Sequence, residues 1–183
     1  VNNQTVALGN APNNGTVSTP APQLYLFNQS ALNLNSAITD GGVATTLVKS
    51  GAGVLSLYGT NTYTRGTIIN AGTLLVGPGG VLPGNVDPSV GIVLNAATLT
   101  ESAGAVLPLD NDYRLNGAAT LNLFGDNTLT GALRFEPSGL TGTPTVNLAG
   151  NTVPMVMVAG SPVLKAAGVT VGITATQTVT GTG

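Results

Sequence analysis

The sequence predicts an all-β protein, a parallel β-solenoid in which short strands wind into stacked coils. Two observations carry this prediction. Residues 43–77 hold four short apolar runs separated by turns rich in Gly and Asn, with almost no charge. Residues 117–131 then echo the sequence that begins at Gly51, without a gap and at an offset of 66. Such repetition favours a solenoid, because each coil must place its apolar stripe and its turn where its neighbours place theirs.

The composition limits the core, the surface and the partners. Aromatic residues make up 4% of the 183 residues and Trp is absent, so Val, Leu, Ile and Ala must fill a thin core. Charged residues make up 7%, against about 25% in an ordinary soluble domain. Five scattered basic residues cannot form a stripe that binds nucleic acid. The net charge of −2 gives little repulsion between copies, which favours self-association.

The N-terminal segment, residues 1–22, is rich in Asn, Pro, Thr and Gly, and we expect an arm or a cap there with one strand at 5–8. The solenoid is predicted to occupy residues 23–173. Its first full coil begins at 23–27 and 30–35, where alternating Leu residues lie on one face.

The central segment 43–77 supplies the template of the predicted coils. Its strands are expected at 46–48, 54–58, 67–69 and 73–76. Residues 77–84 are too rich in Pro and Gly for a strand and predict a surface loop. Further strands are expected at 90–94, 97–100, 105–107, 145–148, 153–158 and 169–173. With coils of roughly 22 residues, an offset of 66 corresponds to three turns. The whole chain is then predicted to form about eight coils.

The C-terminal segment, residues 174–183, alternates like a strand but contains no charge and no clear terminator. An unterminated, uncharged strand offers its backbone groups to another chain. No run of 18 apolar residues occurs anywhere in the 183 residues. We therefore expect no membrane insertion of the chain as a helix.

The residues available for catalysis are few. His and Cys are absent, which removes the usual general base, the thiol nucleophile and the common zinc ligands. Asp110 and Asp112 could belong to a calcium loop or a polysaccharide-cleaving pair, or form a turn in which the side chains bond their own backbone. Glu101 and Glu136 could form a glycosidase pair only if the fold brought them together. We therefore predict no enzyme, no catalytic or metal site and no cofactor, with a polysaccharide-active enzyme as a minor alternative.

Aromatic and Asn residues mark equivalent positions of the repeat. Tyr58 and Phe124 are predicted to stack as equivalent rungs near a corner of the solenoid, and Asn61 and Asn127 to form an internal ladder that caps backbone groups. Alternatively, the aromatic residues line a sugar-binding face. They are Tyr25, Tyr58, Tyr63, Tyr113, Phe27, Phe124 and Phe135. Glycosylation sequons begin at Asn3, Asn14 and Asn28, and the sequence does not decide whether they carry glycans.

The run LVKSGAGVLSLYGTNTYTRGT at 47–67, with NAGTL at 70–74, resembles the passenger-associated transport repeat of bacterial autotransporters. That repeat reads roughly L-x-K-x-G-x-G-x-L-x-L-x-G-x-N-x-Y-x-G-x-T, followed by x-x-x-x-G-x-L. Arg65 is an extra residue before Gly66 and suggests a slightly wider turn. The resemblance implies a right-handed parallel β-helix that is secreted and displayed at the cell surface. It identifies a scaffold, on which activity is expected in inserted loops or separate domains.

Two functions follow as expectations, both extracellular or at the bacterial cell surface. In the first, the ends of the rod pair with other copies, through 174–183 or the N-terminal arm, and build a filament. In the second, the chain is a segment of an adhesin passenger that binds host or surface glycans along its flank. The sequence starts at Val1 without an initiating Met, which indicates a processed chain or a fragment.

Overall fold

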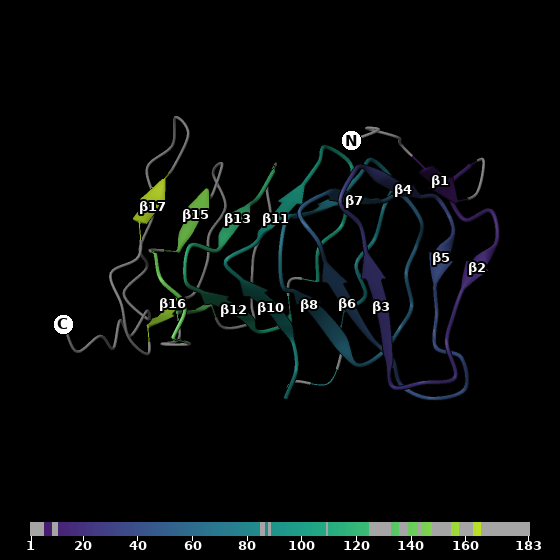
Figure 1. The fold of residues 1–183 in the computed structure, drawn as a ribbon, viewed down its shortest axis with the longest axis horizontal. Helices are drawn as coiled ribbons and strands as arrows, with labels where there is room; N and C mark the ends of the chain where they lie inside the picture. Colours follow the sequence, from purple (N-terminus) through teal and green to yellow (C-terminus); the bar gives the residue numbers. More distant parts are fainter. Residues whose placement is uncertain are drawn as a thin grey trace.

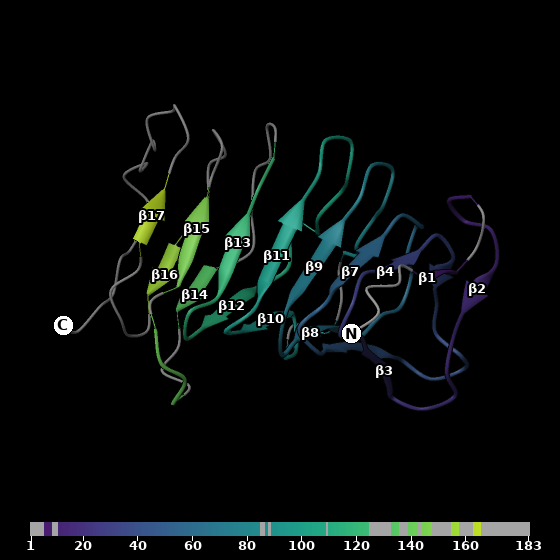
Figure 2. The ribbon, with the colours of Figure 1, turned by 45° about the horizontal axis from the view of Figure 1, so that its top comes forward.

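The chain winds as a parallel β-solenoid, which we describe from a computed structural model (Figures 1 and 2). The structure describes residues 6–8, 11–84, 87, 89–108, 110–124, 133–135, 139–142, 144–147, 155–157 and 163–165. Every regular element in these residues is a strand, and every ladder is parallel. The predicted fold class is therefore confirmed.

Three faces make up the coil. The first is an eight-stranded sheet of β1 (Val6–Leu8), β4 (Leu32–Leu34), β7 (Val54–Leu57), β9 (Thr73–Val76), β11 (Thr98–Glu101), β13 (Thr120–Asn122), β15 (Thr145–Asn147) and β17 (Val163–Lys165). The second is a seven-stranded sheet of β3 (Gln23–Phe27), β6 (Thr46–Ser50), β8 (Gly66–Ile69), β10 (Ile92–Asn95), β12 (Tyr113–Asn116), β14 (Leu133–Phe135) and β16 (Met155–Met157). The third consists of β2 (Thr16–Val17), β5 (Ala37–Ile38) and single bridges that join Thr60, Val81 and Val106.

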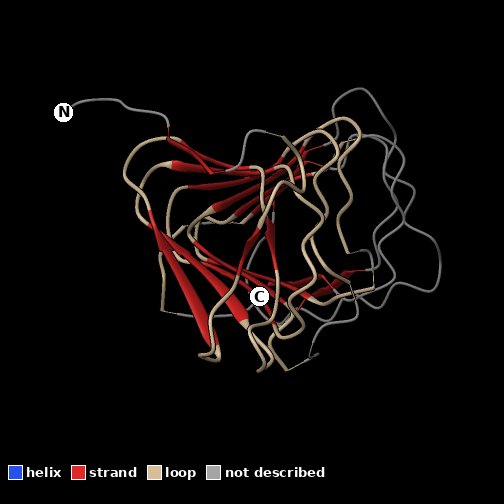
Figure 3. Cartoon of the chain, turned by 90° about the vertical axis from the view of Figure 1, so that its right-hand side faces the viewer, coloured by secondary structure: helices blue, strands red, loops and turns tan. Residues whose placement is uncertain are grey.

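About five turns, from β1 to β12, are described on all three faces. The eight-stranded sheet extends further and carries one strand from each of eight successive coils, as the predicted coil number requires. The third face is described only from β2 to the bridge at Val106. Figure 3, which looks along the solenoid, shows strands of the two long sheets bordering a common interior.

The register explains the internal repeat of the sequence. Leu55 pairs with Leu74, Leu74 with Leu99, and Leu99 with Leu121. Three steps along the eight-stranded sheet thus lead from position 55 to position 121, which confirms the prediction that an offset of 66 corresponds to three turns. All four Leu side chains are fully buried, and a buried Leu contributes about 2 kcal/mol.

Several predicted elements differ from the observed ones. The predicted surface loop at 77–84 is wrong in part, because Val81 joins the third face and Leu82 is only 1% exposed. The run at 105–107 forms a single bridge instead of a strand. Short strands that the sequence did not predict are β2, β5, β12, β14 and β17.

The two ends of the chain follow the same winding as far as they are described. β1 pairs with β4 and β2 with β5, so the described part of residues 1–22 builds the first rung. The predicted strand at 169–173 and the segment 174–183 lie outside the described residues. The division into arm, solenoid and tail stays a prediction.

Candidate functional site

The most unusual buried group of the solenoid is Lys49, at the end of β6. Its side chain is fully buried, because residues 47 and 49 of β6 point inward. The Nζ atom donates to the carbonyl oxygens of Gly51 at 2.7 Å, Ala71 at 3.0 Å and Ser50 at 3.3 Å. Burial lowers the pKa of the Lys49 amine. Lys49 therefore links the turn after β6 to the turn of the next coil.

Glycine residues make this linkage possible by keeping the two turns close. Gly51 has a φ of +85°, in the left-handed region that favours glycine. A Cβ at Gly53 would lie 2.2 Å from the carbonyl oxygen of Ser30, and a Cβ at Gly72 would lie 2.6 Å from that of Gly51. No side chain fits at such distances, so these positions hold the backbones of successive turns together.

Asn61 caps backbone groups inside the third face, as predicted. Its Oδ1 accepts from the backbone N–H of Ile38 at 2.9 Å, and its Nδ2 donates to the carbonyl oxygens of Gly59 at 3.1 Å and Val81 at 2.7 Å. Because Thr60 pairs with Val81 in a bridge, the position equivalent to Asn61 in the next coil is Leu82 and not another Asn. The second member predicted for this ladder, Asn127, lies outside the described residues.

Asparagine ladders do occur, at positions that the sequence analysis missed. Asn95 donates from Nδ2 to Oδ1 of Asn70 at 2.8 Å, and Asn116 donates in the same way to Asn95 at 2.7 Å. A second ladder on the eight-stranded sheet joins Asn147 to Asn122. The signal in the sequence is an Asn at the end of an apolar run, spaced by one coil.

The carboxylates are used within the scaffold. Asp112 forms an ion pair with Arg134, with an Nη2–Oδ2 distance of 3.0 Å. The Oε2 of Glu101 accepts from the backbone N–H of Phe124 at 2.9 Å, and the Glu101 side chain is 5% exposed. Asp110 is exposed, and Glu136 lies outside the described residues. Asp112 and Glu101 thus connect neighbouring coils of the scaffold.

No group of three or more acidic residues that could hold a metal ion occurs among the residues that the structure describes. In the same residues, no helix is long and apolar enough to span a bilayer.

The predicted stacking of Tyr58 on Phe124 is wrong. The two residues occupy equivalent positions three turns apart, which corresponds to about 14 Å along the axis. Tyr58 instead lies against Gly77 of the next coil, where an added Cβ would come within 2.3 Å of the Tyr58 ring. Phe124 is 54% exposed.

Two other tyrosines lie fully inside the solenoid. The Tyr63 hydroxyl and the Thr67 hydroxyl are 2.6 Å apart, and the Tyr113 hydroxyl donates to the carbonyl oxygen of Pro108 at 3.0 Å. Desolvation raises the pKa of both phenols, and for Tyr113 the carboxylates of Glu101 and Asp110 add to the effect. These rings are core residues and cannot line a sugar-binding face.

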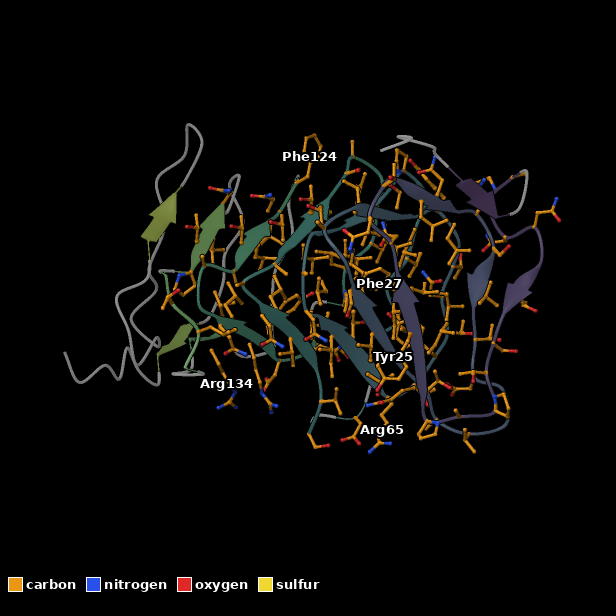
Figure 4. All side chains as sticks on the ribbon, viewed as in Figure 1. Tyr25, Phe27, Arg65, Phe124 and Arg134 are labelled. Carbon is orange, nitrogen blue, oxygen red and sulfur yellow. The ribbon has the colours of Figure 1, made fainter. Side chains whose placement is uncertain are left out.

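Aromatic side chains do reach the surface together on β3. Tyr25 is 65% exposed and Phe27 is 68% exposed, and both point outward from the strand (Figure 4). Leu24 and Leu26 alternate with them and pack against the core. Of the aromatic residues named from the sequence, these two form the most exposed pair in the described part of the chain.

Comparison with known proteins identifies the repeat. Residues 47–76 and 115–136 match the family model described as passenger-associated-transport-repeat. No curated protein matches the chain significantly. No solved structure does so either. The first matched segment contains Lys49 and the turns that it links, and the second contains the equivalent coil three turns further on.

Proposed function

We propose that this chain, which carries two passenger-associated transport repeats, is a non-enzymatic scaffold segment of a bacterial surface protein. The observation that carries the proposal is the role of the residues that define the repeat. Lys49, Gly51 and Gly53 hold adjacent turns together, while Leu55 and Leu57 are fully buried. The described residues of the first repeat thus serve the winding of the chain.

The absence of catalytic equipment in the sequence supports the same conclusion. The chain contains no His and no Cys, and Asp112 and Glu101 bond to Arg134 and to the backbone of Phe124. General acid and base catalysis needs a titratable group within reach of a substrate. A carboxylate that is engaged in the scaffold is poorly placed for that role.

The surface location can be tested in cells that produce the protein. We expect an antibody against the folded chain to label intact cells, and external protease to remove this label without lysis. A cytoplasmic protein of known location serves as the control for leakage. Labelling that requires permeabilised cells would contradict the proposal.

We further propose that the solenoid associates end to end through an open strand edge. β3 is the last strand at one end of the seven-stranded sheet. Pro22 and Asn28, on either side of it, bond to β6. Because alternate residues of a strand direct their backbone groups to opposite sides, the odd-numbered residues face away from β6. These residues are Gln23, Tyr25 and Phe27.

The substitution Gln23→Pro tests this edge. Proline removes the N–H of residue 23, which does not bond to β6, and a proline at the first residue of an edge strand is tolerated. We expect wild-type chains to form linear assemblies, seen by electron microscopy and light scattering, and the variant to form fewer. Gln23→Thr, which retains the N–H, is the matched control. Equal assembly of wild type and Gln23→Pro would exclude this edge.

A further inference from the structure

We propose that the outer face of the seven-stranded sheet, over β3, β6, β8 and β10, binds a linear neutral polysaccharide laid along the solenoid axis. This site is separate from the strand edge discussed above, because its side chains project sideways from the solenoid while the edge groups point along it.

The face presents an apolar row that begins with an aromatic ring. Tyr25 pairs with Val48, Val48 with Ile68, and Ile68 with Val93. These residues point outward, because the residues between them face the core. Over four successive strands the row extends about 14 Å. It therefore offers an apolar strip parallel to the axis, in which the exposed Tyr25 ring lies at one end, Val48 is covered, and Ile68 and Val93 are half-buried.

A second row runs beside the apolar row and is polar after its first member. It begins with Phe27, which pairs with Ser50. The Asn ladder of Asn70 and Asn95 continues the row in the following coils. The ladder bond uses one N–H of the Asn95 amide, and an amide nitrogen carries two. The second N–H can donate to a ligand, and the ladder already fixes the orientation of the amide.

These two rows match the chemistry of a sugar chain. A pyranose ring has an apolar face of C–H groups, which packs on an aromatic ring, and a rim of hydroxyl groups, which amides bind. Binding sites for small ligands combine such apolar surfaces with a few placed polar groups. A polymer of these rings repeats both features along a line, as do the stacked coils.

The lack of charge on the face selects a neutral polymer. None of the outward residues on β3, β6, β8 and β10 carries a charge at neutral pH. The first charged member of the apolar row is Arg114 on β12. Arg114 bonds to the carbonyl oxygen of Ser89 at 3.0 Å, and Arg134 in the next coil is paired with Asp112. A sulfated or uronic acid polymer would find few positive charges along the strip.

The exposed area favours a small ligand over a second copy of the chain. Tyr25 and Phe27 are the two widely exposed side chains of the apolar face, at 65% and 68%, whereas Val48 is 4% exposed. Since an aromatic side chain buries about 150–250 Å², the two rings offer roughly 200–330 Å². A stable protein interface needs about 800 Å² from each partner.

The test measures the binding of cellohexaose and chitohexaose to the full chain by calorimetry, with a heparin hexasaccharide as the anionic probe. We expect saturable binding of at least one neutral probe and none of heparin. Tyr25→Ala and Phe27→Ala should each weaken binding roughly tenfold. Tyr25→Phe, which retains the ring, should bind within about twofold of wild type. Phe124→Ala, at an exposed aromatic residue far from the face, is the matched control and should bind like wild type.

Circular dichroism establishes that each variant is folded, and light scattering at the same concentrations gives its oligomeric state. Three results would overturn the proposal: no binding of either neutral probe, equal loss in Phe124→Ala, or stronger binding of heparin. A mass that falls from dimer to monomer in Tyr25→Ala without any glycan binding would assign the face to a second copy. None of these results depends on Gln23→Pro, so the face and the strand edge are tested separately.

Discussion

The two matched repeats build equivalent coils with different interiors. Lys49 of the first repeat and Leu115 of the second occupy equivalent positions, three rungs apart in the seven-stranded sheet. Lys49 donates to carbonyl oxygens of two turns, whereas Leu115 is a fully buried apolar residue. Gly53 of the first repeat likewise corresponds to Ala119 of the second, which is fully buried.

This difference shows that the coil can be closed in two ways. In the first repeat the turns approach so closely that no Cβ fits at Gly53, and a buried amine satisfies the carbonyl oxygens. In the second repeat an Ala and a Leu fill the same space with apolar contacts. Polar linkage and apolar packing thus give the same register, and substitutions at equivalent positions separate their contributions.

The largest expected effect is that of Gly53→Ala. The new Cβ would lie 2.2 Å from the Ser30 carbonyl oxygen, and the backbone there cannot move without opening the turn. We expect the free energy of unfolding, measured by urea titration, to fall by about 3 kcal/mol or more. Ala119→Gly, the reciprocal change, should cost only about 1 kcal/mol. Similar losses in both variants would mean that the two turns are equally tight.

The next largest effect is a loss of stability at alkaline pH that Tyr63 of the first repeat causes. Its pKa is raised by burial above the ordinary value of 10.0, so the folded state holds a proton that the unfolded state releases. The stability from this group is complete below pH 10.0 and is lost as the pH rises towards the folded pKa. The loss is about 1.4 kcal/mol per pH unit, or about 2 kcal/mol between pH 10 and 11.5.

Tyr63→Phe removes this contribution and is measured by urea unfolding across the same pH range. The variant should lose about 2 kcal/mol less than wild type. Tyr113, whose pKa is raised in the same direction, serves as an internal reference through Tyr113→Phe. In the second repeat the position equivalent to Tyr63 is Leu129 in the sequence. If the free energy of unfolding falls equally with pH in wild type and in Tyr63→Phe, then folding does not raise the pKa of Tyr63 and the prediction is contradicted.

The sequence was sufficient for the fold class and the register, because Gly and Leu recur at the same places in both repeats. It was insufficient for β12, where Tyr113 and Leu115 point inward but Arg114 lies between them and an Asp-rich turn precedes them. It placed an Asn ladder at Asn61, although the coils differ in length and bring Leu82 into the next position. The role of Lys49 could have been found, since alternation along β6 directs its side chain into the core.

Lys49→Met tests the polar linkage directly. Methionine fills a similar volume but leaves the carbonyl oxygens of Gly51 and Ala71 without their donor, so we expect a loss of about 1–2 kcal/mol in urea unfolding. Leu115→Met, a volume-conserving change at the equivalent position, should cost less. A larger loss in Leu115→Met would contradict the assignment of the linkage to Lys49.

The Lys49 amine also predicts the sign of a pH dependence. Its pKa is lowered from 10.5, so the unfolded state binds this proton more tightly than the folded state. The stabilisation is complete above pH 10.5 and is lost as the pH falls through the lowered pKa. Wild type should therefore gain stability relative to Lys49→Met as the pH rises towards 10.5.

The smallest expected effect concerns the ladder that connects the two repeats. Asn70 belongs to the first repeat and Asn116 to the second, and Asn95 between them bonds to both. Asn95→Ala removes two side-chain hydrogen bonds at a half-buried position, and should lower the free energy of unfolding by about 1 kcal/mol. Asn122→Ala breaks the separate ladder to Asn147 and is the matched control.

A double-mutant cycle tests whether the first ladder also couples the two repeats. If it does, Asn95→Ala should reduce the coupling energy between Gly53→Ala and Ala119→Gly. An unchanged coupling energy would mean that the ladder stabilises each coil locally and does not carry the coupling between the repeats.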